Sequence, residues 1–124
     1  VPGNTIDKDP TVTVKADSEA CWLFVKVEKS DNFDDFMTYE TENGWTALTG
    51  ETGVYYRTVG TAAADRGFAV LKDNKVTVKD GVTKQMLNAL TADTYPTLTF
   101  TAYAVQQDNI TDVSTAWAAA KAAQ

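Results

Sequence analysis

The sequence contains no histidine and a single cysteine, and each shortage removes a class of chemistry. Without histidine, the chain lacks the commonest general base, the usual zinc ligand and the residue that activates a nucleophilic serine or cysteine. One cysteine cannot form an intramolecular disulfide or a cysteine-rich metal site. No apolar run approaches the roughly 18 residues that a membrane span needs. These absences argue against most hydrolytic and redox enzymes, and no cofactor is expected.

Basic residues are also scarce, because 11 Lys and Arg stand against 17 Asp and Glu, for a net charge of −6. This balance argues against nucleic acid and anionic membranes as partners, since binding to phosphate needs a cationic face. Threonine, in contrast, occupies 19 of the 124 positions and often alternates with other residues. Because threonine is β-branched and favours strands, the composition is typical of an extracellular β-module.

Alternating apolar residues predict about seven short strands separated by turns. The strongest pattern is Ala20–Glu28, whose odd positions are all apolar and form the core face. Residues 11–15 also alternate, and Pro10 before them suits a strand at a sheet edge. Asp73-Asn74 is expected to be the loop of a two-residue hairpin. The other strands are expected at 38–42, 54–59, 68–72, 75–79 and 97–105.

Two or three short helices are expected beside these strands. A single turn follows Asp31-Asn32, Thr83 caps a helix over 84–90, and Thr111 or Asp112 caps a terminal helix. The spacing of the apolar residues in the helix over 84–90 predicts that it packs on a sheet; they are Val82, Met86, Leu87 and Leu90. The elements predict one domain over residues 1–124, an antiparallel, jelly-roll-like β-sandwich with a C-terminal helix.

Few residues carry a signal for catalysis or metal binding. Asp31, Asp34 and Asp35 offer oxygen ligands for calcium, but their spacing does not fit the twelve-residue calcium loop. A capped helical turn explains these carboxylates as well, so calcium binding stays open. Cys21 falls on the core face of its strand, which favours an inert buried thiol over a nucleophile. A glycosidase that uses carboxylates alone would need two acids across a cleft, and the sequence marks no such pair.

The aromatic residues leave two interpretations open. Trp22 and Phe24 lie opposite the apolar face of their strand, so they are either covered by a loop or exposed. For the other two tryptophans the first interpretation is structural. Trp45 is expected to plug one end of the sandwich, and Trp117 is expected to hold the terminal helix on the sheet. Alternatively, two or more of a set of four rings form an exposed platform for a glycan; the set is Trp22, Trp45, Tyr55 and Tyr56. That platform would make the chain a carbohydrate-binding or adhesive surface module.

Several segments carry a resemblance over nearly the whole chain. The segment Pro2–Val14 reads PGNTIDKDPTVTV, and after it come CWLFVKV at 21–27, GW at 44–45, GVYYR at 53–57, TAYAVQ at 101–106 and a helix with Ala116-Trp117. In order and spacing they resemble the TasA/camelysin-like family of secreted biofilm-matrix proteins of Gram-positive bacteria. The resemblance implies a jelly-roll-like sandwich, export with a dedicated signal peptidase, and assembly into matrix fibres. The metallopeptidase label given to some relatives does not carry over, because the zinc ligands are absent.

The resemblance also implies a mechanism of assembly, donor-strand complementation, in which an N-terminal segment of one subunit completes the sheet of the next. The expected function is therefore a secreted structural subunit and not an enzyme. Its expected partners are other copies, through sheet edges, together with cell-surface or matrix polymers. Family members usually carry another strand before the Pro-Gly turn, so an unpaired edge or groove is expected here. The candidate assembly contacts are Thr11, Val12, Thr13, Val14, Lys15, Trp22 and Phe24.

Overall fold

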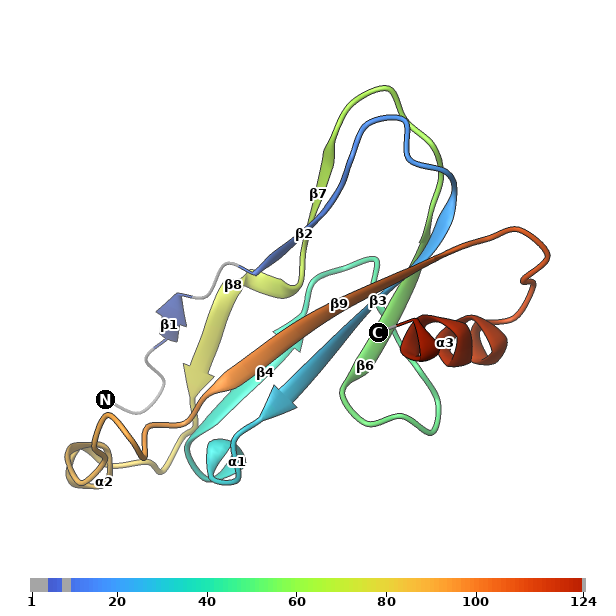
Figure 1. Cartoon of the computed structure of the whole chain (residues 1–124). Coiled ribbons are helices and arrows are strands. Elements are labelled where there is room, and N and C mark those ends of the chain that lie inside the picture. The colour runs from blue at the N-terminus through green and yellow to red at the C-terminus, as the bar shows by residue number, and fades with distance from the viewer. Residues whose placement is uncertain (1–4, 8–9, 124) are drawn as a thin grey trace.

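Strands β3 (Cys21–Lys29), β6 (Val54–Val59) and β9 (Leu98–Gln106) form where the sequence alternates apolar residues with polar or aromatic ones. Together with the short β5 (Thr46–Ala47), they make an antiparallel four-stranded sheet in the order β5-β6-β3-β9. These elements come from a computed structural model that describes residues 5–7 and 10–123 (Figure 1). The Pro-Gly turn expected at positions 2–3 lies outside the described residues.

Two smaller antiparallel sheets supply the opposing layer. In one, β2 (Thr11–Val14) pairs with β7 (Arg66–Ala69). In the other, β8 (Leu71–Val78) lies between β1 (Thr5–Asp7) and β4 (Met37–Thr41). The core forms where β3 packs against these sheets, and it includes Leu23, Val25, Val27, Val14 and Val70. The predicted fold class, a mainly antiparallel β-sandwich with short helices, is confirmed.

Three short helices complete the described part of the chain: α1 (Phe33–Phe36), α2 (Lys84–Asn88) and α3 (Val113–Ala122). Helix α3 lies against the four-stranded sheet, on the face away from the two smaller sheets (Figure 1). Trp117 is 5% exposed, and its indole N–H donates to Glu51 Oε1 at 2.7 Å. The prediction that Trp117 holds the terminal helix on the sheet matches this packing.

The predicted hairpin at Asp73-Asn74 was wrong. Both residues have a φ of 55°, but they lie inside the single strand β8. Tyr39 of β4 pairs with Val76, whereas Thr41, two residues later, pairs with Leu71, so the extra residues of β8 bulge out of the ladder. Asp and Asn tolerate the left-handed conformation in a bulge as well as in a hairpin turn, so these residue types do not distinguish the two.

Helix α2 packs less closely than its apolar spacing predicts. Thr83 caps the helix as expected, since its side chain accepts a hydrogen bond from the Met86 N–H at 3.1 Å. No residue of α2 is buried, and Met86 is 42% exposed, so the predicted packing of Met86 was wrong. Only Val82 before the helix and Leu87 within it join the apolar cluster beneath β8 and β4.

Helix α3 begins at a charged cap. The Asp112 carboxylate accepts hydrogen bonds from the Thr115 hydroxyl at 3.1 Å and from the Thr115 N–H at 2.8 Å. These bonds, the hydroxyl bond foremost, lower the pKa of Asp112 below its ordinary value of 3.8. The cap therefore stabilises the fold fully above pH 3.8 and loses that contribution as the pH falls through the lowered pKa.

We expect the cap to be measurable as a pH-dependent difference between two chains. Asn also caps helices but does not titrate, so Asp112→Asn keeps the geometry and loses the charge. The difference in unfolding free energy between the natural chain and Asp112→Asn should be largest near neutral pH and shrink below about pH 4. Urea unfolding at several pH values, followed by tryptophan fluorescence, measures it. A difference that stays constant with pH would contradict the assigned cap.

Candidate assembly groove

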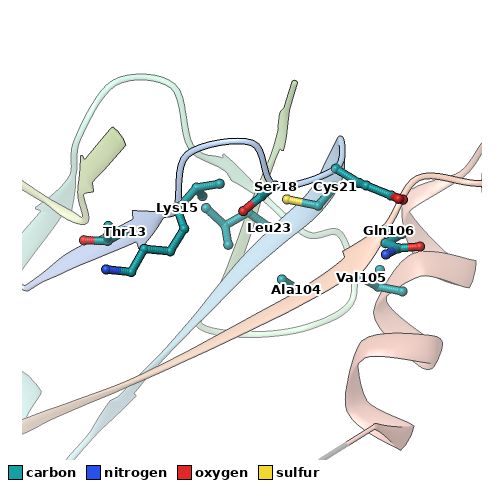
Figure 2. Close-up of a pocket in the computed structure, with 10 residues that line it drawn as sticks. Thr13, Lys15, Ser18, Cys21, Leu23, Ala104, Val105 and Gln106 are labelled. Atoms are coloured by element: carbon teal, nitrogen blue, oxygen red, sulfur yellow. The ribbon is translucent and has the colours of Figure 1, made fainter. Parts of the chain in front are cut away.

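An open groove of about 350 Å³ runs between β2 and β9 (Figure 2). Its lining includes Leu23 and Cys21 of β3, which are both buried. Thr13, Val14 and Lys15 line the side of β2, and Ala104, Val105 and Gln106 line the side of β9. Ser18 and Glu19 lie on the connection from β2 to β3 and complete the lining. The groove therefore brings together the ends of three strands.

Strand β9 has main-chain groups beside this groove that pair with no other strand of the described residues. Hydrogen bonds at both ends of the β3–β9 ladder fix the pattern: the Gln107 N–H donates to the Ala20 carbonyl, and the Ser30 N–H donates to the Thr97 carbonyl. In an antiparallel ladder this direction alternates, so odd-numbered residues of β9 bond to β3 and even-numbered residues point their N–H and C=O groups away. Within the described residues, β9 pairs with β3 alone. Its outer edge therefore carries the main-chain groups of residues 98, 100, 102, 104 and 106.

Strand β2 turns a similar edge toward the groove. The Val70 N–H donates to the Pro10 carbonyl, so the same alternation assigns the main-chain groups of Val12 and Val14 to β7. The main-chain groups of Thr13 then point away from β7, and Thr13 lines the groove. The groove is thus bordered by two strand edges, one from each layer of the sandwich.

The inner face of the four-stranded sheet is uncovered next to this edge. Ala102 and Ala104 lie directly across from Val25 and Leu23, which are 1% and 3% exposed. The two alanines are nevertheless exposed, whereas Phe100 on the same face of β9 is half-buried. The opposing layer of the sandwich therefore stops short of this stretch of β9, and its alanine side chains on the inner sheet face are exposed to solvent.

The groove lining contains a thiol, Cys21, and a lysine, Lys15. Burial raises the pKa of the Cys21 thiol, although the positive charge of Arg66 opposes this effect, and so the thiol stays neutral. Lys15 pairs with Asp65 at 3.8 Å, and both side chains are more than half exposed. With a neutral thiol and a paired lysine, the groove is suited to binding main chain and apolar side chains.

Of the seven predicted assembly contacts, Thr13, Val14 and Lys15 line the groove, whereas Thr11, Val12, Trp22 and Phe24 do not. Those two aromatic residues lie on the other face of the sheet, beneath α3. Phe24 is 0% exposed, and its ring lies 5.1 Å from that of Trp117. The Trp22 indole N–H donates to the Ile110 carbonyl at 3.2 Å. The expectation that Phe24 is an accessible contact does not fit this burial, and the element that covers it is a helix and not a loop.

The four rings of the alternative glycan platform do not lie in one plane. Trp45 is 8% exposed and donates a hydrogen bond to the Ala69 carbonyl at 2.8 Å, as a residue that plugs the sandwich would. The guanidinium of Arg57 lies 4.9 Å from its ring centroid and 4.4 Å from that of Phe68. The rings of Trp22 and Tyr56 are tilted by 52°. Every ring pair in contact within the described residues is tilted or edge-on.

Around α1, the side chains of Asp34 and Asn32 are engaged with neighbouring residues. Asp34 pairs with Lys29 at 2.8 Å, and this bond foremost lowers the pKa of Asp34. The Asn32 amide donates to the Thr94 carbonyl at 2.7 Å and accepts a hydrogen bond from the Ser30 hydroxyl. The part of the chain that the structure describes holds no group of three or more Asp, Glu, Cys or His side chains placed to bind a metal ion. Asp31, Asp34 and Asp35 thus form no such group.

The lining residues that sequence reasoning missed are Ser18, Glu19, Cys21, Leu23, Ala104, Val105 and Gln106. A signal for Ala104 is the run Ala102-Tyr103-Ala104, in which small residues stand across from large residues of β3. Among residues 5–7 and 10–123, no helix is both long enough and apolar enough to cross a membrane. Comparison of the chain with protein-family models, with curated proteins and with solved structures finds no match.

Proposed function

We propose that this chain is a structural subunit of an extracellular or biofilm-matrix fibre, assembled by addition of a strand from one copy to the groove of the next. The observation that carries the proposal is the exposed stretch of the inner sheet face beside the outer edge of β9, which pairs with no strand other than β3 within the described residues. An extended segment in the groove would hydrogen-bond to the outer main-chain groups of β9. Such pairing supplies affinity, and side chains that fill pockets supply register.

The side chains of the groove favour a particular kind of inserted segment. Every second side chain of the segment would enter the space above Leu23 and Cys21, which is lined mainly by apolar groups. Burial of apolar area there contributes about 25 cal/mol for each Å² removed from water. An alternating segment of threonine and valine or isoleucine therefore fits the groove. We place this segment at the N-terminus of the adjacent copy, as the resemblance to the TasA/camelysin-like family implies.

The composition supports a structural role outside the cell. Cys21 is the only cysteine, so no disulfide can form or rearrange within the chain in an oxidising environment. A net charge of −6 keeps separate copies soluble until specific strand pairing overcomes their repulsion. We therefore include secretion, and a final location in the matrix or at the cell surface, in the proposal.

A pair of engineered cysteines tests where copies bind one another. Ala104→Cys places a thiol in the groove, and Thr99→Cys places one on the opposite face of the same strand, both in a Cys21→Ala background. Ala104 and Thr99 are exposed in the single chain, so both thiols should react with a maleimide dye before assembly. After assembly, followed by light scattering and electron microscopy, the thiol at 104 should be protected and the thiol at 99 should still react.

Two outcomes would contradict the proposal. The full chain, with its natural N-terminal extension if it has one, could stay monomeric at high concentration. Alternatively, it could form fibres in which position 104 remains as reactive as position 99. The first result excludes self-assembly, and the second excludes this groove as the contact.

A further inference from the structure

A second cavity, of about 420 Å³, lies at the end of the β3–β6 ladder and shares no lining residue with the assembly groove. Its size falls within the range of sites for small molecules. The main chain at one wall is fixed, because the Val27 N–H donates to the Gly53 carbonyl at 2.7 Å and Gly53 has a φ of 80°. A Cβ at that position would lie 2.5 Å from the Val27 carbonyl oxygen, so glycine is required there. The cavity is therefore preformed.

Two tyrosine hydroxyls lie at this cavity with unused hydrogen-bonding capacity. Tyr39 of β4 and Tyr55 of β6 approach each other across the two layers, and their oxygens are 2.9 Å apart. Neither hydroxyl has a second partner among the described residues, and both side chains are half-buried. One hydroxyl donates to the other, so the pair retains one free O–H donor and several lone pairs. Half-buried hydroxyls in this state are suited to a ligand that both donates and accepts.

Lys29 and Asp34, which also line this cavity, form an ion pair that adds a hydrogen-bond donor and an acceptor side by side. Lys29 Nζ lies 2.8 Å from Asp34 Oδ1 and 5.7 Å from the centroid of the Tyr39 ring. The spacing within this ion pair, like that between the tyrosine hydroxyls, is comparable to the spacing of neighbouring hydroxyls on a pyranose ring. A vicinal diol can therefore accept from Lys29 and donate to Asp34 at the same time.

The charges of the cavity favour a neutral ligand. Its lining contains two lysines, Lys26 and Lys29, and two acids, Glu28 and Asp34, so they sum to zero. The whole chain carries a charge of −6, which repels acidic polymers. A neutral ligand rich in hydroxyls, with apolar C–H faces for the tyrosine rings, matches this mixture of groups. We propose that this cavity binds a neutral pyranose unit of a polysaccharide, an activity beyond strand-mediated assembly and independent of it.

Titration of the full chain with defined oligosaccharides tests this site. The probes are the pentamers of β-1,4-linked glucose and of β-1,4-linked N-acetylglucosamine, with an alginate oligomer and tetraalanine as the acidic and peptide alternatives. Isothermal calorimetry should detect at least one neutral pentamer. Tyr55→Phe, which removes one hydroxyl and keeps the ring, should weaken its binding about five- to tenfold. Tyr56→Phe on the opposite face of the same strand is the matched control and should leave binding unchanged.

Asp34→Asn supplies a second variant at an exposed position, should Tyr55→Phe fold poorly, and it should weaken the same pentamer. The proposal is overturned if neither neutral pentamer binds, if only alginate or tetraalanine binds, or if Tyr56→Phe weakens binding as much as Tyr55→Phe. Because the groove and this cavity share no residue, the proline variant of the groove described below should bind the pentamer normally. Failure of fibre assembly and failure of sugar binding are therefore separate results.

Discussion

Replacing Ala104 with proline is expected to weaken assembly at least tenfold while leaving the single chain folded. The main-chain N–H of Ala104 points away from β3, so the substitution removes no hydrogen bond from the four-stranded sheet. Proline is tolerated at such outward positions of edge strands. An incoming strand, however, loses the donor at the centre of its contact and meets the proline ring. We expect the association constant to fall about tenfold or more, which corresponds to roughly 1.4 kcal/mol for each factor of ten.

Two further variants distinguish an effect on the exposed edge of β9 from an effect on the stability of the sheet. Ala104→Ser keeps the N–H and should assemble like the natural chain. Val105→Pro removes an N–H that faces Trp22 across the β3–β9 ladder, so it should destabilise the sheet itself. Light scattering and electron microscopy measure assembly, and urea unfolding measures stability. Normal fibres from Ala104→Pro would exclude pairing along this edge of β9.

Much of the sheet could be predicted from local patterns because one face of each long strand is apolar. Strand β6 has the predicted bounds, and β3 and β9 each begin and end one residue later than predicted. The cap at Thr83 was predicted from residue type and position, and Asp112 was one of two residues expected to cap the terminal helix, since the chemistry of a helix start is local. These features depend on neighbours within a few residues.

The groove and the second cavity depend on pairing between distant strands, and no local pattern contains that information. Ala104 and Thr13 are far apart in the sequence and line one groove only because β9 and β2 end up at facing edges. Tyr39 and Tyr55 meet because β4 and β6 belong to opposing layers. The alternation of β3 shows that Phe24 leaves the inner face, but not that α3 covers it. Sequence reasoning therefore gives the faces of the strands, and tertiary pairing decides which faces stay open.

The largest effect on stability is expected at Phe24. Its side chain is fully buried, with ring centroids 5.1 Å from Trp117 and 6.4 Å from Tyr56. Phe24→Ala removes the ring against which α3 packs and leaves a cavity that a helix and a sheet cannot easily close. Such substitutions cost about 3–5 kcal/mol, a large share of the 5–15 kcal/mol that stabilises a typical domain. Urea unfolding with far-ultraviolet circular dichroism measures the loss.

The position of α3 supplies a second readout of the same substitution. Because Trp117 is buried between the helix and the sheet, loosening of α3 should shift its fluorescence to longer wavelength before the strands unfold. Tyr95→Ala is the matched control, since Tyr95 is 40% exposed and its loss should change stability by less than about 0.5 kcal/mol. Equal stability of Phe24→Ala and Tyr95→Ala would mean that α3 does not pack on Phe24 in solution. In that case the outer face of β3 would be open to partners as well as the groove.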